Sequence, residues 1–167
     1  MRMRVVVLSD THLHRGSRRL LPEAAYRTLD GADAVLHAGD VVDEALLQVL
    51  ATVAPTHAVL GNNDHGLVGV LPGRLELDLG GVAVALVHDS GSRIGRPARM
   101  RRRFPRADVV VFGHSHIPVD EAGDGGQWLF NPGSPTQRRG QPHHTVGVLD
   151  IDDGRVVGHR IVVVDPP

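Results

Sequence analysis

The sequence contains no cysteine and no lysine, and each absence excludes a class of chemistry. Without cysteine, the chain can form neither a disulfide nor a metal site built on thiolates. All eighteen basic residues are arginine, so Schiff-base catalysis by a lysine is excluded as well. A metal ion would therefore need oxygen and imidazole ligands, which suit divalent ions such as Mn²⁺, Fe²⁺ or Zn²⁺.

Aromatic residues are also scarce, with one Trp, one Tyr and three Phe in 167 residues. We therefore expect a core built from valine, leucine and alanine. Few rings are available to stack on bases, and the net charge of −1 gives no overall attraction to a polyanion. A nucleic-acid partner is therefore not expected.

Long apolar runs are missing too. The first run, residues 5–8, is too short for the core of a signal peptide, and no run approaches the length of a transmembrane helix. We expect a cytoplasmic protein without a membrane segment.

The hydrophobic pattern predicts one α/β domain over residues 1–167. β-α units fill the first third, and short strands with glycine-rich turns follow, including a hairpin around Gly80-Gly81. Two mixed sheets packed face to face, with helices outside, would bury these elements. The expected helices are residues 22–29, 43–54 and 97–104, and the expected strands are residues 5–8, 34–37, 56–60, 74–79, 82–88, 109–112, 119–121, 128–130, 144–151 and 156–164.

Five of the expected strands run into a polar segment that carries potential metal ligands. Residues 109–112 lead through Gly113, which we expect to leave the sheet with an unusual φ and ψ, to two histidines. Seven donors exceed what one tetrahedral ion needs, whereas two ions sharing a carboxylate would use them all. The seven donors are Asp10, His12, Asp40, Asn62, His88, His114 and His116.

The order of these motifs resembles that of the calcineurin-like metallophosphoesterase superfamily. Asn131-Pro132-Gly133-Ser134 is similar to a motif of its small YfcE-like phosphodiesterase branch. The resemblance implies a four-layer α/β/β/α sandwich and two divalent ions, with Mn²⁺ expected and Fe, Zn or Ni as alternatives. It further implies that Asp10, His12 and His116 hold one ion, that Asn62, His88 and His114 hold the other, and that Asp40 bridges them.

The implied activity is hydrolysis of a small phosphoester, most simply a phosphodiester, by in-line attack of a metal-bridging hydroxide. A non-catalytic metal-binding scaffold for protein interactions, as in the retromer-associated member of the branch, is the alternative. A phosphomonoesterase or a nuclease also stays open, as does a homo-oligomer.

Two positions depart from the family pattern. Asn63 stands where many relatives carry a histidine that contacts the substrate phosphate, and an amide cannot deliver a proton near neutral pH. His65 is a candidate substitute acid. Asp89, a further candidate catalytic residue, follows His88 where relatives carry glycine. We expect it to support a metal-bound histidine through a hydrogen bond, and the alternatives are a metal ligand or a side chain that faces solvent. Arg138 and Arg139 are candidates for substrate contact.

Two further features have alternative interpretations. His37 is either a support for the neighbouring ligand motif or a buried histidine with satisfied hydrogen bonds. Seven arginines between Arg93 and Arg106 form either a solvated helix face, a phosphate-binding cluster or a nucleic-acid footprint.

Overall fold

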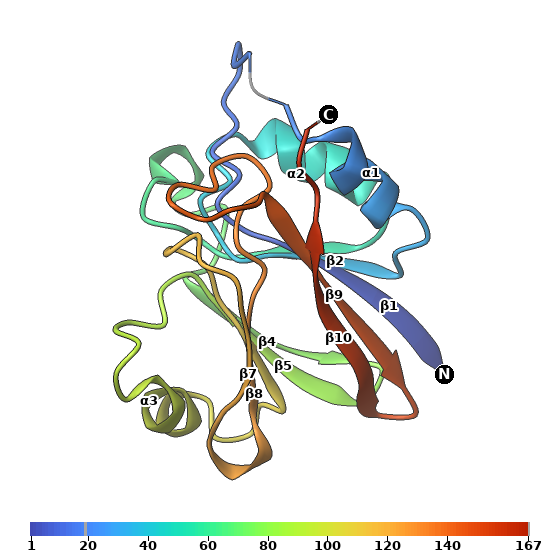
Figure 1. Cartoon of the computed structure of the whole chain (residues 1–167), viewed down its shortest axis with the longest axis vertical. Helices are drawn as coiled ribbons and strands as arrows, with labels where there is room; N and C mark the ends of the chain where they lie inside the picture. The colour runs from blue at the N-terminus through green and yellow to red at the C-terminus, as the bar shows by residue number, and fades with distance from the viewer. Residues whose placement is uncertain (19, 167) are drawn as a thin grey trace.

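Two five-stranded sheets face each other, with α1 and α2 outside one sheet and α3 outside the other (Figure 1). The computed structural model describes residues 1–18 and 20–166. The predicted four-layer α/β/β/α sandwich is thus confirmed. In chain order, the elements of this described part are β1 (Arg2–Leu8), α1 (Glu23–Leu29), β2 (Ala34–His37), α2 (Glu44–Ala51), β3 (Thr56–Ala58), η1 (His65–Leu67), β4 (Arg74–Leu79), β5 (Val82–Val87), α3 (Arg96–Arg103), β6 (Val109–Val111), β7 (Val119–Ala122), η2 (Asp124–Gly126), β8 (Trp128–Asn131), β9 (Thr145–Asp152) and β10 (Arg155–Val163).

Both sheets are mixed. In the first, with order β10-β9-β1-β2-β3, the strands β1, β2 and β3 are parallel, and β9 pairs antiparallel with β1. In the second, with order β4-β5-β6-β8-β7, the strands β5, β6 and β8 are parallel. Parallel neighbours end at the same edge of a sheet, so the polar segments that follow them are brought together.

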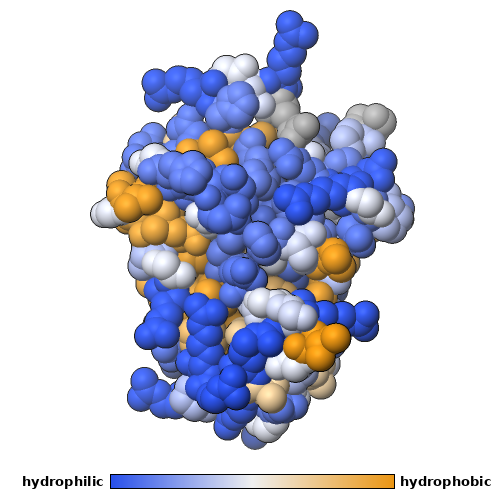
Figure 2. Space-filling view, turned by 90° about the vertical axis from the view of Figure 1, so that its left-hand side faces the viewer, coloured by the Kyte–Doolittle hydropathy of each residue, from blue (hydrophilic) through white to orange (hydrophobic). Residues whose placement is uncertain are grey.

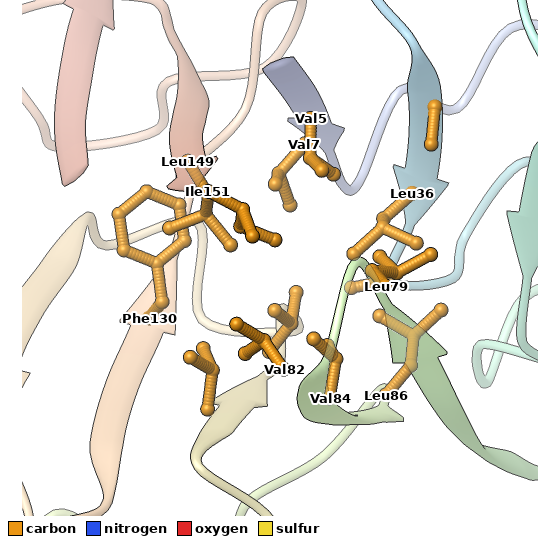
Figure 3. Close-up of a cluster of buried hydrophobic side chains, with 14 of the residues drawn as sticks. Val5, Val7, Leu36, Leu79, Val82, Val84, Leu86, Phe130, Leu149 and Ile151 are labelled. Carbon is orange, nitrogen blue, oxygen red and sulfur yellow. The ribbon is translucent and has the colours of Figure 1, made fainter. Parts of the chain in front are cut away.

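Alternation along the strands produces the layers. Val5 and Val7 point between the sheets, whereas Val6 and Leu8 point towards α1 and α2. In the same way, Val109 and Val111 face inward while Val110 packs with α3. The inner cluster is mostly aliphatic, as the scarcity of aromatic residues predicts, and Phe130 supplies its aromatic ring (Figure 3).

The expected element boundaries are close but not identical. Asp43 caps α2 as predicted, because its carboxylate accepts the Ala45 N–H at 2.9 Å. The helix ends at Ala51 rather than at residue 54. The strand expected over 56–60 ends at Ala58, because the Leu60 N–H leaves the ladder and donates to the Pro72 carbonyl. In the described chain, no helix is long and apolar enough to cross a membrane.

Gly113 joins the two sheets at their common edge, but not in the expected way. Its φ lies outside the left-handed region, so the turn does not need the freedom of glycine. The position needs space instead: a Cβ atom here would lie 1.8 Å from Ser9 Oγ and 2.7 Å from Asp10 Oδ2. The absence of a side chain therefore lets the segment after β6 lie directly against the segment after β1.

Substituting Gly113→Ala is expected to lower the free energy of unfolding by about 2–3 kcal/mol or more, because the new methyl group overpacks this contact. Gly66→Ala is the matched control, since nothing lies within 4 Å of the corresponding Cβ position, and it should stay within about 0.5 kcal/mol of the wild type. Urea denaturation of both variants measures the difference. Equal stabilities would show that the two segments are not in tight contact.

Candidate metal centre

The seven predicted donors gather at the edge where the parallel strands end. Asp10, His12 and His116 form one group and Asp10, Asp40 and His88 a second, each with ligand atoms within 4.8 Å of one another. In the first group, His12 Nε2 lies 3.3 Å from His116 Nε2, which is 3.5 Å from Asp10 Oδ1. Residues more than a hundred positions apart thus present their lone pairs to one small volume.

Asn62 and His114 extend the second group. His88 Nε2 and His114 Nδ1 each lie 2.9 Å from Asn62 Oδ1. The three side chains come from three different segments of the chain, after β3, β5 and β6. Their acceptor atoms converge as they would around a shared cation.

Asp40 lies between the two groups. Its Oδ2 atom is 3.4 Å from His12 Nε2 and 3.6 Å from His88 Nε2. Asn63 holds this carboxylate with two hydrogen bonds of 2.8 Å, from its backbone N–H to Oδ1 and from its side-chain amide to Oδ2. Burial raises the pKa of Asp40, but the Asn63 bonds and the two histidines outweigh it and hold the pKa below its ordinary value.

The donors are held in unfavourable backbone conformations. Asp10, His12, Asp40, His114 and His116 all have φ between 46° and 71°, in the left-handed region. Each such non-glycine residue costs on the order of 1–3 kcal/mol and persists only where the surroundings impose it. Five of the seven predicted ligands share this strain, as is typical of functional sites.

The protons of two histidines are directed away from the centre. His88 Nδ1 donates to the Ala38 carbonyl at 2.7 Å, and His116 Nδ1 donates to the Gln137 carbonyl. A carbonyl only accepts, so Nδ1 carries the proton and Nε2 presents a lone pair to the centre. Burial lowers the pKa of His116 to about 4 and also lowers that of His12, so both rings are neutral near pH 7.

One buried atom tests whether this donor set fits a cation. Asp10 Oδ1 is fully buried and has no hydrogen-bond partner among the described residues. Burial raises the pKa of Asp10 to about 6, although the Ser9 hydroxyl bond opposes the shift. A buried carboxylate oxygen without a partner is unfavourable unless a cation or a proton satisfies it. Together with the convergent imidazoles, it fits a divalent ion.

Asp64 supports the centre in a way that the sequence did not reveal. It is buried, and its carboxylate accepts the N–H groups of Asp40, Val42 and Gly61 at 2.7–2.9 Å. It therefore fixes the two segments that carry Asp40 and Asn62. The sequence feature that could have indicated this role is the position of Asp64, two residues after Asn62, where the chain must turn back.

The segment Asn131-Pro132-Gly133-Ser134 braces the other side. Asn131 Nδ2 donates to the Gly113 carbonyl at 3.0 Å, and Ser134 Oγ donates to the Asp10 carbonyl at 2.8 Å. This matches the supporting place that the resemblance implies. The predicted His37 is buried: Nδ1 accepts the Gly39 N–H and Nε2 bonds Thr11 Oγ1 at 3.0 Å, so it is a satisfied buried histidine that also joins two ligand segments.

Two predicted catalytic residues lie outside the cluster. The Asp89 carboxylate is exposed and accepts the Gly91 N–H at 2.7 Å. The support expected from it comes instead from the Ala38 carbonyl, which occupies His88 Nδ1. His65 is exposed at the start of η1.

The predicted substrate arginines differ from each other. Arg138 donates to the Gln141 carbonyl within its own loop. Arg139 is exposed, and its positive charge adds to the effect of burial in lowering the pKa of both His12 and His116. Arg139 is thus the member of the pair that acts on the centre electrostatically. A cleft of about 860 Å³ opens beside the centre, with His12, Arg18, Asn63 and Gln137 in its walls.

The arginine-rich segment is only partly a solvated face. Arg99 donates to the carbonyls of Ser90, Ser92 and Ile94, and Arg103 donates to the Asp89 carbonyl. These two residues fasten the segment after His88 to α3. Strongly hydrophilic side chains gather over the lower part of the face in Figure 2, on the side where Figure 1 shows α3.

Comparison with known proteins agrees with this geometry. Residues 3–154 match the family described as the calcineurin-like phosphoesterase superfamily domain. A probable metallophosphoesterase of Methanocaldococcus jannaschii is 32% identical over 157 residues, which cover 90% of this chain and 77% of the relative.

Two solved structures share the fold. Vps29 from Entamoeba histolytica, complexed with Zn²⁺, is similar with a TM-score of 0.77 and 23% identity, covering 98% of this chain and 99% of that one. An archaeal phosphodiesterase is similar with a TM-score of 0.72 and 21% identity, covering 96% and 99%. The match of the family over almost the whole chain, and the metal-type donor cluster within it, lead to one conclusion: this chain is a member of the calcineurin-like phosphoesterase superfamily.

Proposed function

We propose that the protein is a phosphodiesterase that works with two divalent metal ions. The observation that carries the proposal is the convergence of seven donors from five segments, with lone pairs inward and one buried carboxylate oxygen unpartnered. In this proposal Asp40 is shared by both sites. Asp10, His12 and His116 complete one site, and Asn62, His88 and His114 complete the other.

The proposed ion is Mn²⁺, with Fe, Zn or Ni as alternatives, because neutral imidazoles mixed with carboxylate and amide oxygens suit borderline divalent ions. When bound, a pair of such ions lowers the pKa of coordinated water and neutralises charge that develops on phosphoryl oxygens. The residues of the chain then have to bind the substrate and orient its phosphoryl group for in-line attack.

Arg139 is the proposed substrate contact of the chain. It is exposed beside the donor cluster, and its guanidinium matches two oxygens of a phosphate group. Arg138 is already engaged with the Gln141 carbonyl, so its contribution would be smaller. The net charge of −1 favours a small phosphoester over a nucleic acid.

Asn63 determines which substrates react well in this proposal. Its side-chain amide is engaged by Asp40, and it can neither move to the leaving group nor deliver a proton. Substrates whose leaving group needs no protonation, such as aryl phosphodiesters, should therefore react faster than alkyl esters.

A non-catalytic scaffold of the same fold is the second candidate, since the fold is shared with Vps29. The intact donor set fits both candidates, because a metal-binding scaffold would also give the strained and buried ligands a purpose, so activity has to decide between them. Absence of hydrolysis of both aryl diesters and aryl monoesters by the metal-loaded protein would favour the scaffold.

Titration of the metal-free protein with Mn²⁺ in a calorimeter should show two ions per chain. His114→Ala should leave one, because it removes a ligand of only one site, and Asp40→Asn should weaken both. Asp89→Asn is the matched control: its carboxylate binds its own loop, so two ions should still bind. One ion in the wild-type protein would contradict the two-site arrangement.

Hydrolysis of bis(p-nitrophenyl) phosphate with Mn²⁺ should fall by at least about a hundred-fold in Asp40→Asn, because loss of a direct ligand should exceed the 10–100-fold effect of outer contacts. Arg139→Gln should raise KM about tenfold, as expected for the loss of a charge-assisted hydrogen bond. Arg138→Gln is its control and should change KM less. Release of p-nitrophenolate measures all three, and an unchanged rate in Asp40→Asn would contradict the proposal.

Asn63→His should supply the proton that the wild-type residue cannot deliver. The rate on an alkyl phosphodiester, divided by the rate on the aryl diester, should rise about tenfold or more. Asn63→Gln keeps the amide and should not raise this ratio. Steady-state rates on the two substrates decide, and an unchanged ratio in Asn63→His would show that leaving-group protonation is not limiting.

A further inference from the structure

A second pocket lies between α3 and the segment that follows His116. It has a volume of about 370 Å³, and its walls include Arg93, Arg96, Ser115, Ile117 and Glu121. Ser115 stands between His114 and His116, so the pocket shares a wall with the metal-ligand segment. It is separate from the cleft beside Asn63 and Gln137.

Arg96 is the unusual feature of this pocket. Only 8% of its surface is exposed, and its guanidinium carbon lies 4.9 Å from the centre of the Phe112 ring. Its Nε atom is buried without a hydrogen-bond partner among the described residues. Burial lowers the pKa of this guanidinium from its ordinary value. The Arg96 Nε–H group is therefore a buried donor without an acceptor, which is unfavourable unless an anion or another acceptor satisfies it.

The neighbouring charges do not supply that anion. Asp120 already accepts Trp128 Nε1 at 2.6 Å and lies 2.8 Å from His159 Nδ1. Glu121 is exposed and raises the pKa of Arg96 through its charge, but no carboxylate of the described chain lies within ion-pair distance of Arg96. By contrast, Arg99, one turn along α3, is occupied by three carbonyls. The unpartnered Nε–H group of Arg96 is therefore a property of this pocket rather than of the whole segment.

We propose that this pocket is an oxyanion site for a phosphate group, with Arg96 as its buried anchor and Arg93 as a second cation. The flat guanidinium, supported by the Phe112 ring, presents a fork of N–H groups that matches two phosphate oxygens. Ser115 Oγ accepts the Ile117 N–H at 3.2 Å, which leaves its own proton available to the ligand. Phosphate differs from a carboxylate in its extra oxygens, which three donor groups can bind together.

Two sources can supply such a phosphate. One is a free phosphate ion. The other is a phosphate group on the substrate, beyond the one that reacts, and this source rests on the proposed phosphodiesterase function. Because the pocket shares a wall with the metal-ligand segment, a phosphate group of a substrate bound at the centre could occupy it, as could a free phosphate ion.

The site itself is tested on metal-free protein, so the result does not depend on catalysis. Inorganic phosphate, at ionic strength matched with chloride, should shift the Arg96 Nε–H resonance in NMR spectra. It should also raise Tm by about 3–5 °C at tenfold its dissociation constant. Arg96→Met should abolish the rise and should not lower Tm in phosphate-free buffer, because it removes an unsatisfied buried charge. Arg102→Met, exposed on the same helix, is the matched control and should still respond.

Two results would contradict the proposed phosphate site. One is an equal response of wild type and Arg96→Met to phosphate. The other is an Arg96 Nε–H resonance that moves in Glu121→Gln but not with phosphate, which would mean that the arginine is paired internally. If Arg96→Met does not fold, the wild-type resonance still decides, and Arg93→Gln should weaken phosphate binding about tenfold.

A kinetic experiment then distinguishes the two sources. The metal-loaded enzyme is given a thymidine dinucleotide with and without a 5′-phosphate. If the substrate phosphate uses the pocket, Arg96→Met should raise KM about 10–100-fold for the phosphorylated dinucleotide only. Unchanged KM for both, with phosphate binding lost, assigns the pocket to free phosphate. Because a dinucleotide has an alkyl leaving group, bis(p-nitrophenyl) phosphate is assayed alongside: hydrolysis of none of the three substrates would count against the proposed function and leave the binding result standing.

Discussion

Asp10 uses its two carboxylate oxygens for different purposes, and the arrangement of the site depends on this division. Oδ2 accepts the Ser9 hydroxyl at 2.7 Å and the His114 N–H at 2.9 Å, which ties the segment after β1 to the segment after β6. Oδ1 has no hydrogen-bond partner among the described residues and stays available to a metal ion. Because β1 and β6 belong to different sheets, this carboxylate links the two sheets at the edge where the donors meet. Ligands from both sheets can then face one another.

The surroundings of the centre also explain how strained ligands remain in place. Left-handed backbone at Asp40, for example, is held by the Asp64 carboxylate, which binds the Asp40 N–H, and by the Asn63 bonds to the side chain. Backbone hydrogen bonds add to this: the His12 N–H donates to the Asp40 carbonyl at 3.0 Å. The strain at each ligand is opposed by contacts that involve its neighbours, so the segments hold each other in position.

Much of the fold could be predicted from the sequence because alternation along Val5–Leu8 has a direct physical meaning. Apolar residues on both faces of a strand require layers on both sides, and the four layers follow. The donor set could be predicted for a similar reason, since each donor follows an apolar run. The resemblance to a known family then divided the donors between two ions.

The roles of individual side chains around the site could not be predicted, because they depend on side-chain directions, which a sequence pattern does not contain. Asp64 and Asp89 both follow a ligand motif, yet Asp64 organises three N–H groups while Asp89 bonds its own loop. Arg96 and Arg99 are three positions apart, yet the buried Nε atom of Arg96 has no hydrogen-bond partner among the described residues, whereas Arg99 donates to three carbonyls. Gly113 was expected to provide a special φ and provides space instead. For Asp64 and Gly113 the decisive neighbours, Asp40 and Ser9, are far away in the sequence.

The dependence of His116 on the Gln137 carbonyl has a consequence for biosynthesis. The donors begin at residue 10, but the last support of the centre follows β8 in the chain. A nascent polypeptide therefore presents isolated aspartates and histidines long before it can assemble the complete centre. Metal uptake should be a late event, coupled to the docking of the two sheets rather than to the emergence of any single ligand.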